Sequence, residues 1–100
     1  MKKLKIIFLE EAILDFEEIW FYTFKTWSLE QADRYHSLIM KEIEFLATKP
    51  QSGKALDHIR KGYKSSKVKS HYIFYRFNSN ELEIVRILHE NMDIPNRLDD

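Results

Sequence analysis

Four residues in the second half of the chain, Lys61, Arg76, Arg86 and His89, are of types that could cleave RNA. Cleavage at a ribose 2′-hydroxyl needs a general base for that hydroxyl, cations for the phosphate and an acid for the leaving oxygen. Histidine, with a reference pKa of about 6.5, suits the acid–base role, and lysine or arginine would hold the phosphate. These residue types therefore allow a nuclease in which His89 is catalytic.

Each of these side chains could instead serve the fold alone. His89 ends an expected strand, where its simplest role is a hydrogen bond to the chain that follows. Arg76 and Arg86 lie inside expected strands, so they either point from the open face of the sheet at a target or pair with Glu81 or Glu83 across a hairpin. The sequence leaves these alternatives open.

A β-hairpin is expected to carry these residues. Apolar, aromatic and β-branched runs at residues 70–77 and 82–88 are joined by a polar turn, which is a hairpin signal. The first of these runs is apolar on both faces, which favours a central position in the sheet. Another strand is expected at residues 63–68, where two lysines are typical of a sheet edge.

The first half of the chain predicts one strand and two helices. Residues 4–9 are a β-branched and aromatic run. A helical period follows over residues 10–27, and a second helix is expected from a cap at Ser28 to the residues before Pro50. The apolar stripe of the first helix consists of Ile13, Phe16, Trp20, Phe24 and Trp27, widened by Ala12 and Ile19. This order predicts an α+β fold, β-α-α-β-β-β, in which a helical hairpin packs on a mainly antiparallel sheet.

Length and composition predict a single domain over residues 1–100. The chain has no cysteine, and its four histidines show no metal-site spacing, so we expect neither a metal nor another cofactor. The apolar run after the N-terminal lysines is too short for a signal peptide, and no run approaches a membrane span. We therefore expect a cytoplasmic protein without a membrane partner.

The charges are segregated although their sum is zero. Residues 10–48 hold nine acidic and three basic residues, whereas residues 49–76 hold eight basic and one acidic. The basic segment is either an ordinary solvated surface or a site that attracts phosphate or an acidic protein. Under the second interpretation, the candidates for target binding are Lys61, Lys64, Lys67, Arg76 and Arg97.

The C-terminal half also resembles a known family. Residues 62–64 (GYK), 71–76 (HYIFYR), 84–89 (IVRILH) and 92–93 (MD) are similar to ParE-type toxins of the RelE/ParE toxin–antitoxin superfamily. Upstream, residues 15–20 and 50–56 resemble the family's acidic-aliphatic-tryptophan segment and its proline–glycine connection. The resemblance covers nearly the whole chain and is most specific over residues 71–93.

The resemblance implies the toxin of a type II, plasmid-stabilising module that a ParD-like antitoxin holds inactive in a hetero-oligomer. ParE-type members inhibit DNA gyrase without a catalytic site, so the protein would not be an enzyme. RelE-type members share the fold but cut messenger RNA on the ribosome, and a binding module without toxicity is a third possibility.

The surroundings of His89 depart from the nuclease pattern. RelE-type nucleases that use a histidine often pair it with a tyrosine or a carboxylate near the C-terminus. Here His89 is followed by Glu90-Asn91-Met92-Asp93, and no tyrosine lies beyond Tyr75. The departure favours the gyrase inhibitor, which needs only a binding surface.

The first predicted helix carries more aromatic residues than one face can bury. Exposed apolar side chains of this kind indicate a partner. If the family resemblance holds, the antitoxin's C-terminal segment covers them by helix-in-groove contact, strand addition or both. The candidates for antitoxin binding are Trp20, Phe21, Tyr22 and Phe24.

Overall fold

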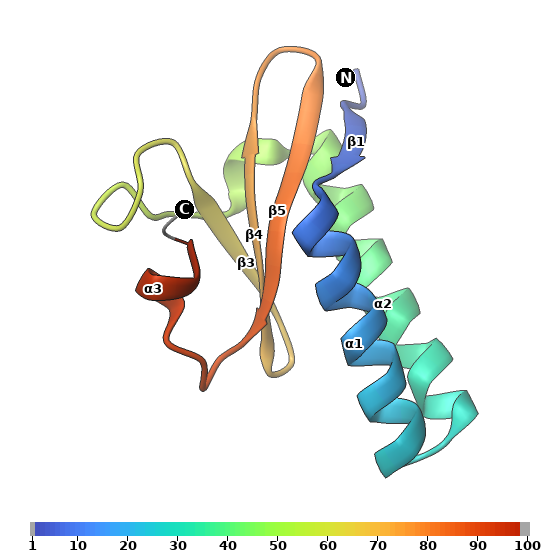
Figure 1. Cartoon of the computed structure of the whole chain (residues 1–100). Coiled ribbons are helices and arrows are strands. Elements are labelled where there is room, and N and C mark those ends of the chain that lie inside the picture. The colour runs from blue at the N-terminus through green and yellow to red at the C-terminus, as the bar shows by residue number, and fades with distance from the viewer. Residues whose placement is uncertain (1, 99–100) are drawn as a thin grey trace.

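The computed structural model describes residues 2–98, in which two long helices pack on one face of a five-stranded sheet (Figure 1). The strand order is β1-β5-β4-β3-β2, with β1 parallel to β5 and the other neighbours antiparallel. The elements are β1 (Lys5–Phe8), α1 (Glu10–Thr26), α2 (Leu29–Thr48), the 3₁₀ turn η1 (Pro50–Ser52), β2 (Lys54–Ala55), β3 (Lys64–Val68), β4 (His71–Phe77), β5 (Glu81–His89) and α3 (Ile94–Leu98).

The predicted α+β class and element order are confirmed, with three additions: η1, β2 and the short C-terminal helix α3. The segment expected to be a loop, residues 49–61, contains η1 and the two-residue strand β2, which pairs with the start of β3. The central position predicted for β4 is also confirmed by the strand order. No helix within residues 2–98 combines the length and the apolarity needed to span a membrane.

Successive strand residues point to opposite sides of the sheet, and an apolar cluster covers each side. Ile73 and Tyr75 of β4 join the core under α1 and α2. Phe74, between them, joins a second cluster with Tyr63 and Leu98, under α3 and the loop before β3. Figure 1 shows α3 on the side of the sheet opposite to the helical pair.

A β-bulge changes which side chains of β5 point to each face of the sheet. Tyr75 pairs with Ile84 but Phe74 pairs with Arg86, so Val85 is an extra residue in the ladder. The insertion shifts the alternation, and Ile84 and Ile87, three residues apart, therefore both reach the core under the helices.

Strand β1 is shorter than β5, and a residue of α1 bonds to the part of the β5 edge beyond its end. Strand β1 pairs with β5 only as far as Ile84. Farther along, the buried carboxylate of Asp15 accepts a hydrogen bond from the backbone N–H of Ile87 (3.0 Å) and two from the Arg86 guanidinium, from Nε (2.7 Å) and Nη2 (2.9 Å). An edge amide thus finds its acceptor on a helix. We call this arrangement the Asp15 clamp.

The clamp corrects the expectation for Arg86, whose ion pairs are with carboxylates of α1 rather than across the hairpin. It binds α1 instead, with Glu11 as a further carboxylate at 3.0 Å, and its Nη1 donates to the backbone carbonyl of Arg97 (3.3 Å). Arg76 does pair with Glu83, one of its expected partners.

The inward face of α1 differs from the predicted stripe. Its buried residues are Ala12, Asp15 and Phe16, whereas Phe24 and Trp27 are exposed, the latter by 72%. The clamp places a polar residue on the contact face, and the C-terminal half of α1, which carries the exposed end of the stripe, projects beyond the sheet (Figure 1). In α2 the predicted cap is confirmed, since the Gln31 N–H donates to the Ser28 hydroxyl.

Replacing Asp15 with alanine is expected to lower the free energy of unfolding by about 3 kcal/mol, because Arg86 and the Ile87 amide lose their shared acceptor. Urea unfolding at neutral pH measures the change. Glu11→Ala is the matched control, since that carboxylate is largely exposed and should contribute less than about 1 kcal/mol. Equal losses in the two variants would contradict the role given to the clamp.

Candidate protein-binding surfaces

A cleft of about 1060 Å³ opens between the C-terminal half of α1, the N-terminal half of α2 and one end of the sheet. Figure 1 shows the helical pair projecting beyond that end, where β3 turns into β4. Apolar side chains of the helices form its walls, and β4 and β5 contribute histidines to its floor. We call it the tip cleft. Its lining includes Phe21, Tyr22, Trp27, Tyr35, His71 and His89.

A second hollow of about 700 Å³, the outer groove, lies between α1 and α2. It is lined by apolar residues with Glu17 and Asp33 at its edge. Trp20 is fixed there, because its Nε1 donates to the Asp33 carboxylate (3.0 Å) and its ring stacks on Phe24, with ring centroids 5.3 Å apart.

The predicted antitoxin-binding residues therefore surround the end of α1. Trp20 and Phe21 line the outer groove, and Phe21 and Tyr22 line the tip cleft. Phe21 and Tyr22 are exposed by 57% and 69%, and Phe24 is exposed beside Trp20. Trp20 contacts both Phe21 and Phe24, and the role of all four side chains in binding stays a prediction.

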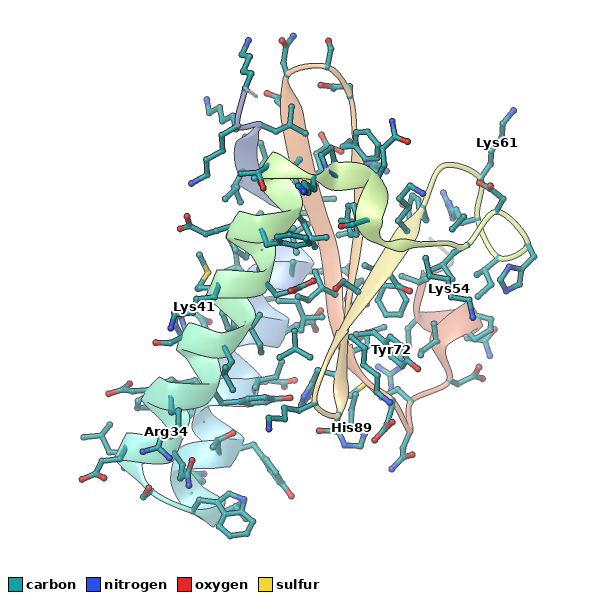
Figure 2. The ribbon with its side chains drawn as sticks, turned by 180° about the vertical axis from the view of Figure 1, so that it is seen from behind. Arg34, Lys41, Lys54, Lys61, Tyr72 and His89 are labelled. Atoms are coloured by element: carbon teal, nitrogen blue, oxygen red, sulfur yellow. The ribbon has the colours of Figure 1, made fainter. Side chains whose placement is uncertain are left out.

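The predicted nuclease residues are not brought together. Figure 2 shows Lys61 in the loop before β3 and His89 at the opposite end of the sheet. Arg76 and Lys61 share a small hollow with Glu83, which is six residues before His89 on β5, or about 20 Å along an extended strand. Arg86 is held in the Asp15 clamp. Counting residues from the hairpin turn would have placed Arg76 and His89 at opposite ends, and the four residues lie too far apart to bind one phosphate.

The predicted target-binding cations are also spread out and partly neutralised. Lys67 pairs with Glu90 (2.8 Å) and Arg76 pairs with Glu83. Lys64 is half-buried in β3. Lys61 and Arg97 are exposed, and both belong to segments on the face that α3 covers.

His89 has a neighbour that the sequence interpretation missed. His71 is its cross-strand partner, and the two rings lie edge to face with centroids 5.2 Å apart. The Tyr35 hydroxyl contacts Nδ1 of His71 at 2.7 Å, and the Asn91 N–H donates to Nδ1 of His89 (3.1 Å), which is the expected bond to the tail. The hairpin register, counted from its turn, is the signal that could have paired the two histidines.

Burial shifts the pKa values of His71 and Tyr35. It lowers the pKa of His71 to about 4, and the neighbouring His89 adds to the decrease. Burial also raises the pKa of the Tyr35 hydroxyl. His71 is therefore a neutral imidazole at physiological pH. Within residues 2–98, no three histidine, aspartate or glutamate side chains are arranged around a common metal position.

Acidification from neutral pH to about pH 4.5 is expected to destabilise the fold by ~1 kcal/mol through His71. The folded state keeps this ring neutral down to its pKa of about 4, whereas the unfolded chain takes up the proton near pH 6.5. The unfolded state thus binds more protons between these values, so stability is lost as the pH falls. Urea unfolding of the natural protein and of His71→Gln at both pH values isolates the effect, and identical pH slopes would refute it.

Comparison with known proteins identifies the family. The protein-family model described as "ParE toxin of type II toxin-antitoxin system, parDE" matches residues 6–94. Toxin ParE1 of Mycobacterium tuberculosis is 37% identical over 83 residues, covering 82% of this chain and 85% of the relative. Toxin ParE1 of Caulobacter vibrioides is 35% identical over 82 residues, with 82% and 84% covered.

Solved structures share the fold at low sequence identity. A chain of the chromosomal ParDE system from P. aeruginosa has a TM-score of 0.75 at 16% identity, covering 87% of this chain and 96% of its own. A chain of the RelBE2 toxin–antitoxin complex from Mycobacterium tuberculosis has a TM-score of 0.67 at 19% identity, with 89% and 93% covered. With the family match over residues 6–94, these findings show that the chain belongs to the ParE toxin family of type II toxin–antitoxin systems.

Proposed function

We propose that this protein inhibits DNA gyrase and is held inactive by a cognate ParD-like antitoxin in the cytoplasm. Membership of the ParE family over residues 6–94 is the observation that carries the proposal. Two features of the molecule support it. The predicted nuclease residues lie at opposite ends of the sheet, and the exposed surface around the end of α1 is the kind that a protein partner covers.

The antitoxin is proposed to bind around the end of α1. Phe21 lines both hollows, so a segment that enters either one contacts its ring. Aromatic side chains at the centre of an interface contribute most of the binding free energy. A helix that lays its apolar face into a groove is one way to cover such a surface.

The target-binding surface is proposed to lie elsewhere, on the face covered by α3. Lys61 and Arg97 are exposed there, and the Arg60 guanidinium joins the loop before β3 to α3 by donating to the Leu98 carbonyl (3.3 Å). Separate surfaces would let the antitoxin bind without first displacing the target.

Messenger RNA cleavage is the alternative function, and it would need different residues from those predicted. His71, His89 and Tyr35 lie together at the floor of the tip cleft, while Arg76 and Lys61 are remote. Ribosome-dependent cuts in translated message that disappear in His89→Ala, with gyrase unaffected, would establish this alternative.

Protein that arrests growth when expressed is expected to inhibit gyrase supercoiling and to raise the amount of cleaved plasmid. Reversing two charges together, Lys61→Glu with Arg97→Glu, should weaken inhibition roughly tenfold, because complementary charges raise association rates. The matched control reverses Arg34 and Lys41 on α2, which Figure 2 shows on the helical side of the molecule. Full supercoiling activity at a molar excess of this protein would contradict the proposed target.

Phe21→Ser is expected to weaken binding of the antitoxin encoded beside the toxin gene by roughly 30-fold, which corresponds to about 2 kcal/mol at an aromatic hot spot. Calorimetric titration measures the affinity. Phe45→Ser is the matched control, because Phe45 is an exposed aromatic residue that lines neither hollow. Equal affinities of Phe21→Ser and the natural protein would place the antitoxin elsewhere.

A further inference from the structure

The two histidines at the floor of the tip cleft are held by one nitrogen each. Nδ1 of His71 is bonded to Tyr35 and Nδ1 of His89 to the backbone of Asn91. Among residues 2–98, every buried side-chain nitrogen or oxygen has a hydrogen-bond partner. The remaining Nε2 atoms of the half-buried histidines have no hydrogen-bond partner among residues 2–98, so each keeps contact with solvent, and both rings line the tip cleft.

The tautomer of His89 follows from its bond. Because Nδ1 accepts the Asn91 N–H, the neutral ring carries its proton on Nε2 and offers a donor. The ring orientations are fixed by the Tyr35 and Asn91 bonds and by edge-to-face contact between the histidines. The floor of the cleft thus presents a pre-oriented N–H donor beside a second imidazole.

The charges around the cleft favour an anion. Lys25, Arg34 and Lys69 stand at its edge, one each on α1, α2 and the turn between β3 and β4. The carboxylate of Asp15 is held by Arg86 and the Ile87 amide, which leaves Glu18 as the other acidic lining residue. The walls are apolar. Phe21 and Tyr22 come from α1, and Trp27 directly follows that helix.

We propose that the tip cleft binds a polypeptide segment in which an acidic side chain stands beside large apolar ones. Its carboxylate accepts a hydrogen bond from Nε2 of His89. Because the Tyr35 hydroxyl donates to the Val68 carbonyl, the neutral His71 ring keeps its proton on Nδ1, and its Nε2 donates to the carboxylate only once His71 has taken up a second proton. The apolar neighbours of the carboxylate pack on Phe21, Tyr22 and Trp27. This inference rests on the proposed function, because it names the chemistry that the antitoxin presents to this cleft. Carboxylate hydrogen bonds to charged donors are the stronger kind, so this contact contributes selectivity as well as affinity.

Binding of the carboxylate is coupled to a proton. His71 is neutral in the free protein, and its surroundings are Tyr35 from α2, Asp15 from α1, His89 from β5, and the adjacent Glu90 and Lys69. A ligand carboxylate at Nε2 stabilises the imidazolium and raises the pKa of His71. Complex formation therefore takes up a proton, and affinity rises as the pH falls from about 7.5 to about 5.5, a range in which a ligand glutamate stays ionised.

The direct test compares two peptides that differ in one group. Acetyl-Leu-Glu-Phe-Leu-amide carries the carboxylate, and acetyl-Leu-Gln-Phe-Leu-amide replaces it with an amide of the same shape. NMR titration of the natural protein at millimolar peptide should show roughly fivefold tighter binding of the glutamate peptide, a preference that grows toward pH 5.5. The imidazole resonances of His71 and His89 should shift, while those of His36 in the outer groove should not.

Two histidine variants test whether the preference for the glutamate peptide arises in the tip cleft. His89→Gln should remove most of the preference for the glutamate peptide and leave the affinity for the glutamine peptide unchanged, and His36→Gln should change neither. The comparison of peptides on the natural protein needs no variant, so it holds even if a substitution impairs folding. Equal affinities for the two peptides, a preference independent of pH, shifts confined to the outer groove, or no binding at millimolar peptide would each overturn the inference.

The outcomes separate this inference from the proposed function. An antitoxin that binds tightly, with no preference between the peptides, would overturn the carboxylate site and leave the toxin–antitoxin proposal intact. A clear preference in a protein that affects neither gyrase nor growth would support the site and contradict the proposed target.

Discussion

The backbone amide of Ile87 lies on the edge of β5 beyond the end of β1, so its hydrogen bond must come from outside the sheet. The buried carboxylate of Asp15 is the acceptor, and Arg86 neutralises that carboxylate while also donating to the Arg97 carbonyl in α3. One ion pair thus joins the helix on one face of the sheet to the helix on the other. Removing Arg86 would leave the Asp15 carboxylate in a largely buried place without its ion-pair partner, and removing Asp15 would take from Arg86 its buried partner, so either change costs more than an exposed pair contributes.

The binding surfaces follow from where the clamp lies along α1. Asp15 is in the first half of a 17-residue helix, and the second half continues past the end of the sheet (Figure 1). Phe21, Tyr22 and Trp27 consequently have no strand to cover them and stay exposed. The same projection opens the tip cleft above His71 and His89. A partner that fills this space would bury apolar side chains that the isolated fold leaves in water.

Local patterns predicted most of the fold, because periodicity, the Ser28 cap and the polar turn of the hairpin act over short stretches of chain. The inward face of α1 was predicted only in part: Phe16 reaches the core as expected, but the contact residue Asp15 is polar, and an apolar stripe gives such a residue no weight. The partner of Arg86 lies 71 positions away and leaves no local signal. The candidate nuclease residues Arg76 and His89 lie at opposite ends of one hairpin, and the nearby His71 could have been found by counting the hairpin register.

The central claim is that this toxin has a closed half, held by the Asp15 clamp, and an open tip that a partner covers. Hydrogen exchange of the protein, alone and with its cognate antitoxin, tests it most directly. The account predicts strong protection of the Ile87 amide in both states, and new protection on binding in residues 19–29 and 69–71. Protection gained instead in residues 54–64 and α3, with residues 19–29 unchanged, would contradict it.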